Sequence, residues 1–122
     1  MSKQEQLQIE LDSLTRALGG LKGSFLCTLD GMPVAQSVTD PNIQSPRVAA
    51  MAATALGVGR RITETLSTGV LRGTQLTASE GRVFIYMIGD KACLALVAPS
   101  DLAIGLIELE AADAIARLCD IL

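Results

Sequence analysis

The chain has 122 residues, of which 49% are apolar and 19% charged, which suits one folded domain over residues 1–122 and excludes a disordered chain. The net charge is only −3 and the Lys and Arg residues are scattered, which argues against nucleic acid as a partner. No apolar run approaches a membrane span and residues 1–6 carry no apolar signal region, so we expect a cytoplasmic protein without membrane insertion.

The N-terminal third predicts a helix followed by a hairpin. The helix covers residues 3–18 and ends at Gly19-Gly20, because apolar residues recur there every three or four positions, at Leu7, Leu11, Leu14 and Leu18. An apolar strand at residues 23–29 and a shorter strand at residues 34–38 follow, joined by a turn at Asp30-Gly31.

A second helix is predicted from Ser45-Pro46, with Ser45 as its N-cap, to about Leu66. It has hardly any long polar side chain before Arg60, so we expect both of its sides to be covered. Gly57 and Gly59 lie in its interior, where each glycine costs about 1 kcal/mol relative to alanine. Close approach of another backbone would compensate for this cost, and tight packing on the chain's own sheet is the alternative.

Three further strands are predicted at residues 70–79, 83–88 and 92–98, with turns at Glu80-Gly81 and Gly89-Asp90. The middle strand is apolar on both sides, so helices must cover both faces of the sheet.

The last helix is expected to start at a capping pair, Ser100-Asp101, and to run to the end of the chain. Its apolar side should be buried against the sheet and is formed by Leu102, Leu106, Leu109, Ile115, Leu118 and Leu122.

Together these elements predict an α+β sandwich in the order α-β-β-α-β-β-β-α, with a five-stranded antiparallel sheet and helices on both faces. The two more polar strands, 34–38 and 70–79, should be the edges, so the hairpin connections give the strand order 2-1-5-4-3. Strand 70–79 then keeps an open side. Arg72 is its single positive charge and it has no proline, so it lacks most of the usual features that block pairing with another chain.

The residue types give little support to catalysis. Histidine, the usual acid–base group at neutral pH, is absent, and the acidic residues lie mainly in predicted turns or on helix faces. The three cysteines are widely separated, without the paired spacing of metal or redox sites, so Cys27, Cys93 and Cys119 are expected to be small buried side chains. We therefore expect no enzyme, no catalytic residue, no metal and no cofactor.

Essentially the whole chain resembles the roadblock / dynein light chain family, of the type that regulates bacterial gliding-polarity GTPases. The resemblance is carried by residues 18–23, 29–35 and 49–53, by Gly105-Leu106 and by the acidic last helix; the Asp-Gly-x-Pro turn before an alanine-rich helix is its most specific part. It implies a roadblock-like domain over residues 1–122. It also implies a homodimer in which the third strand and second helix of each copy pair to give one continuous sheet, and a small Ras-like GTPase as partner.

The candidate site residues follow from the open strand and the small-residue helix. We expect the dimer interface to contain Met51, Ala52, Ala55, Val58, Gly59, Ile62, Leu71, Gly73, Gln75 and Thr77. The partner-binding candidates are Arg60, Arg61 and Glu64; the two arginines would meet acidic switch loops of a GTPase, or stabilise phosphate charge as an arginine finger. The alternative for this pair is the solvated end of a helix, where the dipole favours cations.

These observations lead us to expect a homodimeric interaction module that binds and regulates a small Ras-like GTPase, as an activator or a scaffold. A structural scaffold that involves no GTPase is one alternative. A small-ligand sensor domain is another, and an unpaired buried polar group would favour it.

Overall fold

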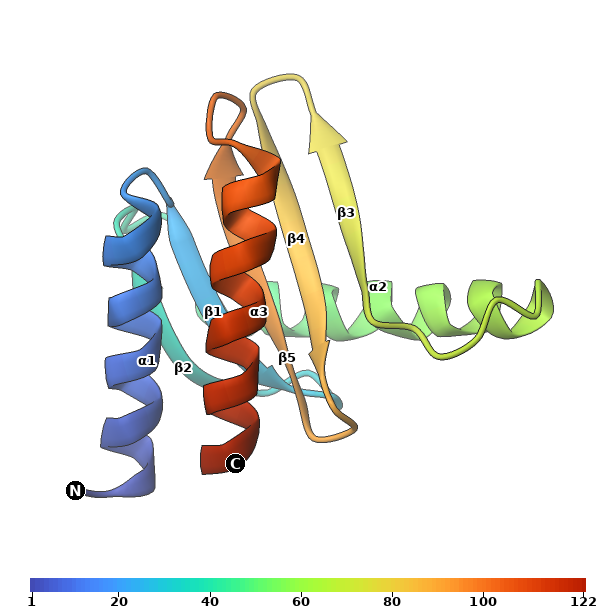
Figure 1. Ribbon diagram of the computed structural model, residues 1–122, viewed down its shortest axis with the longest axis horizontal. Helices are drawn as coiled ribbons and strands as arrows, with labels where there is room; N and C mark the ends of the chain where they lie inside the picture. The colour runs from blue at the N-terminus through green and yellow to red at the C-terminus, as the bar shows by residue number, and fades with distance from the viewer.

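The computed structural model describes residues 1–122 as three helices and one five-stranded antiparallel sheet (Figure 1). In chain order the elements are α1 (Lys3–Leu18), β1 (Gly23–Thr28), β2 (Pro33–Val38), α2 (Ser45–Thr65), β3 (Gly73–Ala78), β4 (Gly81–Ile88), β5 (Ala92–Pro99) and α3 (Ile104–Ile121). The sheet order β2-β1-β5-β4-β3 confirms the predicted fold class and the predicted positions of the two edge strands. None of the helices combines the length and the apolarity needed to cross a bilayer.

The ends of α1 are set by local chemistry. The Ser2 hydroxyl accepts a hydrogen bond from the Glu5 amide at 3.1 Å, and the Glu5 carboxylate accepts one from the Ser2 amide, which makes a capping box. At the other end Gly19 has a left-handed φ of 66° and donates its N–H to the Thr15 carbonyl at 3.2 Å. The predicted bounds of this helix are therefore confirmed.

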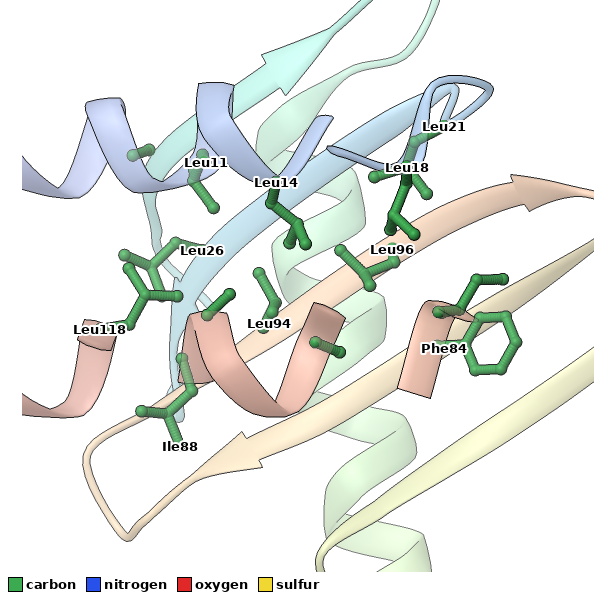
Figure 2. Packing of buried hydrophobic residues seen from close by; sticks show 14 of the residues in the cluster. Leu11, Leu14, Leu18, Leu21, Leu26, Phe84, Ile88, Leu94, Leu96 and Leu118 are labelled. Atoms are coloured by element: carbon green, nitrogen blue, oxygen red, sulfur yellow. The ribbon is translucent and has the colours of Figure 1, made fainter. Parts of the chain in front are cut away.

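The sheet separates two apolar cores. On one face α1 and α3 lie side by side, and their leucines pack on Leu26, Leu94 and Leu96 of the central strands (Figures 1 and 2). On the other face α2 crosses the sheet and supplies a smaller core, formed by Ala49, Ala52 and Leu56 with Phe25, Cys27, Ile85, Cys93 and Ala95. The apolar central strands are thus covered on both faces, as their sequence requires.

The predicted N-caps of two helices are wrong. α2 begins at Ser45 itself, after Gln44, and no side chain caps it. α3 begins at Ile104, because Ser100 and Asp101 lie in a turn that the Leu102 amide closes on the Pro99 carbonyl at 3.3 Å.

The buried side of α3 also differs from the prediction. Its buried residues are Ile107, Ala111, Ala114 and Leu118, whereas Leu106 is 40% exposed and Leu109 is 61% exposed. Ala111 and Ala114 belong to the same core cluster as the leucines of α1, and such small side chains let two helices on one sheet face approach each other closely. The two leucines consequently lie on the outer surface of α3.

The first predicted turn of the three-stranded meander is shifted by one residue. The turn consists of Ser79 and Glu80, and Gly81 is the first residue of β4, without a positive φ. A Cβ at Gly81 would lie 2.8 Å from the Ala98 carbonyl oxygen. This glycine is therefore required by the close approach of β5 and not by the turn.

Candidate interaction surface

The two edges of the sheet differ in how they are protected. Along β2, the side-chain amides of Gln4 and Gln8 on α1 donate to the main-chain carbonyls of Val34 and Gln36, at 2.6 and 2.8 Å. No element pairs with the outer side of β3. One edge is therefore covered by the chain itself and the other is open to a second chain.

The hydrogen-bond pattern shows which backbone groups β3 leaves free. The Met87 amide donates to the Arg72 carbonyl at 2.8 Å, so this directly opposed pair is hydrogen-bonded. In an antiparallel ladder such pairs alternate with pairs whose N–H and C=O groups point away from the partner strand. Gly73, Gln75 and Thr77 occupy those alternate positions, so their backbone donors and acceptors point to the open side. The three residues predicted on this strand thus share one geometry.

α2 has a second apolar face, turned away from its own sheet. We call it the outer stripe of α2; its residues are spaced by three or four positions and are Met51, Ala55, Val58, Ile62 and Leu66. Ala55 is half-buried and also packs against the core under α2. Its four large side chains are 50 to 67% exposed, and Leu76 of β3 adds a further exposed apolar side chain. Figure 1 shows that the C-terminal half of α2 extends past β3, beyond the edge of the sheet. The structure therefore brings an uncovered apolar helix face next to the open strand.

Some predicted interface residues contact their own chain instead. Ala52 is 2% exposed and packs in the core under α2, so it has no surface to offer a second copy, which corrects the expectation for this residue. A Cβ at Gly59 would lie 3.2 Å from Cδ2 of Leu71, so packing within the chain accounts for this glycine. A Cβ at Gly57 would have no neighbouring atom within 4 Å, so packing within the chain does not account for this glycine.

The predicted charge cluster is divided between two sides of α2. Arg60 and Glu64 line a hollow of about 450 Å³ together with Val70 and the turn at Asp90. Arg61 lies on the other side, beside the outer stripe and next to Ile62. The two arginines therefore line different hollows of the surface.

The structure contains one feature that sequence reasoning missed. A groove of about 600 Å³ lies between α3 and the neighbouring strands, and Tyr86, Arg72 and Glu108 are among the residues that line it. The Tyr86 hydroxyl is buried without a hydrogen-bond partner. Desolvation, with a smaller contribution from the negative charge of Glu108, raises the pKa of Tyr86 to about 12. No sequence signal distinguishes Tyr86 from an ordinary residue of an apolar strand.

The cysteines and acidic residues do not form a reactive centre. Cys27 and Cys93 lie directly opposite each other on β1 and β5 and are both buried, whereas Cys119 is partly exposed. A hydrogen bond with Cys93, together with burial, raises the pKa of the Cys27 thiol, so this thiol stays protonated and unreactive. No group of three His, Cys, Asp or Glu side chains is placed to hold a metal ion.

Comparison with known proteins gives a family match and several structural neighbours. The Roadblock/LC7 domain model matches residues 7–98. The fold is similar to that of MglB from Myxococcus xanthus, with a TM-score of 0.92, 16% identity, and coverage of 99% of this chain and 90% of the other. It is also similar to the gliding protein MglB from Thermus thermophilus (TM-score 0.88, 17% identity, coverage 99% and 91%). A further MglB structure, with a tetrameric arrangement, has a TM-score of 0.90 at 17% identity and coverage of 99% and 90%. No curated protein matches the sequence.

Proposed function

The chain belongs to the Roadblock/LC7 domain family, and we propose that it is a homodimeric interaction module that binds and regulates a small Ras-like GTPase. The dimer would form by pairing of β3 with β3 and of α2 with α2 across a two-fold axis. The GTPase would dock on the surface of that dimer. The observation that carries the proposal is the outer stripe of α2 lying beside the unpaired β3.

The pairing of two β3 strands is supported by their backbone geometry. Gly73, Gln75 and Thr77 each direct a donor and an acceptor outward, and no charged side chain within β3 opposes a second copy. Two such edges would form one ten-stranded sheet, because each copy contributes five strands. Isologous pairing of this kind suits a two-fold dimer.

The outer stripe of α2 is long enough to add an apolar contact. From Met51 to Leu66 it extends about 22 Å along the helix. A second copy of the stripe would cover side chains that are now half exposed, and burial of apolar area is the main driving force for association. An MglB structure with a tetrameric arrangement supports association as a property of this fold.

The GTPase as partner is supported by the family and by the similarity to MglB, including the gliding protein from Thermus thermophilus. Regulation would act by docking: the dimer would hold the switch loops of the GTPase in one conformation and orient the GTPase's own catalytic groups. Such a role needs no titrating residue from this chain, which has no histidine. We place Arg60 and Glu64, at the end of α2 beside the β4–β5 turn, in contact with the GTPase.

The dimer is tested by Ile62→Glu, which puts a charge into the outer stripe. The matched control is Ile9→Glu on α1, because the two isoleucines are similarly exposed, Ile9 by 47% and Ile62 by 53%. Light scattering should give twice the chain mass for the wild type and the control, and the chain mass for Ile62→Glu. A dimer that persists in Ile62→Glu at micromolar concentration would refute the assigned interface.

The GTPase is tested by pull-down of Ras-like GTPases from the same genome, loaded with GTP or with GDP. Binding should depend on the nucleotide and should weaken in Arg60→Glu, whereas Arg47→Glu, at the other end of α2, should bind like the wild type. State-independent binding would rule out the regulatory role. Loss of binding in both variants would contradict the placement of the GTPase at the end of α2.

A further inference from the structure

The side of α3 that faces away from the core is apolar. The buried side of this helix consists of Ile107, Ala111, Ala114 and Leu118. At about 100° per residue, the opposite side holds four exposed residues, which are Gly105, Leu109, Ala112 and Ala116. Leu106 lies beside them and is also exposed. We call these five residues the outer face of α3. A surface helix normally carries polar residues on this side, whereas a helix that is apolar on both sides is covered on both.

The shape of the chain leaves room for a partner along this face. Ala112 also lines the groove of about 600 Å³ beside α3, together with Ile115, so the apolar surface continues into a hollow. Figure 1 shows that α1 lies against α3 on one side only, and that no helix covers the same face of the sheet over β3. A Cβ at Gly105 would meet no atom within 4 Å, so the close approach of another backbone is possible there. A rod-shaped partner laid along α3 would contact the outer face and the groove together.

The charges around the outer face are mainly negative. The single basic side chain of α3 is Arg117, and its four acidic side chains are Glu108, Glu110, Asp113 and Asp120. Arg117 is already paired with Glu10 of α1 at 2.6 Å, and this is the one salt bridge of the chain. The hydrogen bond to Glu10, together with the nearby charges of Asp113 and Glu110, raises the pKa of Arg117. The surface along α3 therefore already stabilises one cation, and no ion pair neutralises Glu108 or Asp120.

The sign of this charge decides between the possible occupants. A second copy of α3 would place Glu108 and Asp113 against the same acidic residues, and like charges across an interface repel. Anionic lipids and nucleic acids are disfavoured for the same reason. The groove has the same sign, since Asp90 and Glu108 outnumber Arg72 in its lining. A helix with an apolar stripe flanked by Lys and Arg matches both the apolar face and its acidic borders.

From these features we propose that the outer face of α3 docks a basic amphipathic helix of another protein. The apolar stripe of that helix contacts Leu106, Leu109 and Ala112, and its Lys and Arg side chains lie against Glu108 and Asp113. α3 and α2 pack on opposite faces of the sheet, so the site requires neither the dimer nor the GTPase. The module would thus hold one partner on each face of its sheet.

Three fluorescently labelled peptides, each as long as the 18 residues of α3, test the proposal. The first has leucine at every third or fourth position and lysine elsewhere, the second has glutamate in place of lysine, and the third is the first in scrambled order. Fluorescence anisotropy at about 0.1 M salt should show saturable binding of the lysine helix, with a dissociation constant about tenfold or more below those of the other two. Equal binding of the scrambled peptide, tighter binding of the glutamate helix, or no saturable binding would overturn the proposal.

Two matched pairs of variants locate the binding. Leu109→Ala should weaken binding of the lysine helix about fivefold or more, whereas Ile9→Ala, which shortens an exposed apolar side chain of α1, should bind like the wild type. Glu108→Lys should also weaken binding about fivefold or more, whereas Glu80→Lys changes the net charge equally in the β3–β4 turn and should have a much smaller effect. Unchanged binding in Leu109→Ala or Glu108→Lys, or an equal loss in its control, would refute the site.

Two further measurements separate this site from the dimer and from a second copy. Ile62→Glu, the variant that tests the dimer, should bind the lysine helix like the wild type, and loss of binding there would contradict a site formed by one chain. Light scattering should give the same mass for Leu109→Ala as for the wild type. A lower mass for Leu109→Ala would identify a second copy as the occupant and would overturn the proposal.

Discussion

Replacing Tyr86 by phenylalanine should stabilise the folded chain. The phenylalanine ring keeps the stacking on Phe84 and the cover over Gly73, and it removes a buried hydroxyl that has no hydrogen-bond partner. Leaving such a group unsatisfied costs about 1–3 kcal/mol, so the gain in the free energy of unfolding at neutral pH should be about 1 kcal/mol or more. Most substitutions in a core destabilise, which makes the sign of this effect diagnostic.

The same substitution should change the alkaline limb of the stability profile. Below the ordinary tyrosine pKa of 10.0 the phenol is protonated in both the folded and the unfolded chain, so its contribution does not change with pH. Between 10.0 and about 12 the unfolded chain loses the proton while the folded chain keeps it, so stability falls as pH rises.

Urea unfolding followed by circular dichroism, at about pH 8 and about pH 11, measures both effects. The wild type should lose more stability between the two conditions than Tyr86→Phe. Any change with pH that does not involve Tyr86 is common to both proteins and cancels in the comparison. A Tyr86→Phe protein that is less stable at about pH 8, or that has the same pH dependence as the wild type, would refute the assignment of an unpartnered hydroxyl.

Three further outcomes follow from the open strand, the covered face of α2 and the cysteines. Gln75→Pro should weaken the dimer, measured by light scattering, while the monomer still melts cooperatively, because the N–H that proline removes points away from β4. An undiminished dimer in this variant would contradict pairing through β3. Ala52→Glu should lower the free energy of unfolding by about 3 kcal/mol or more, measured in urea, because it places an unpaired charge in the core; a stable dimer of this variant would show that Ala52 is not buried. In the native protein an alkylating reagent should label Cys119, and it should label Cys27 and Cys93 only after unfolding, as measured by mass spectrometry. Fast labelling of Cys27 and Cys93 in the native protein would contradict their burial.

Much of the fold was predictable because its signals are local in the sequence. The leucine spacing and Gly19 define α1 without reference to any other element, and the capping box of Ser2 and Glu5 adds a signal of the same kind. The strand order follows from the contrast between apolar central strands and more polar edges, together with short hairpin connections. The open side of β3 was predictable for the same reason, since edge positions are visible in composition.

The candidate site was predictable only in outline. The sequence indicated that α2 has apolar residues on all sides, but which of them face the sheet depends on the angle at which α2 crosses it. That angle buries Ala52 and leaves Met51, Val58 and Ile62 exposed. The separation of Arg60 from Arg61, by contrast, follows from helix geometry alone, since neighbours in a helix point about 100° apart.

The sequence by itself determined the number and type of the elements, the order of the strands and the open edge, because hydrophobic periodicity acts over a few positions along the chain. The tertiary structure alone decided which side of each helix is buried, as with Leu109 of α3, and that the Tyr86 hydroxyl meets no partner. These outcomes depend on how α3 packs against α1 and β4, which are separate elements brought together only in space. A local pattern carries no information about such contacts.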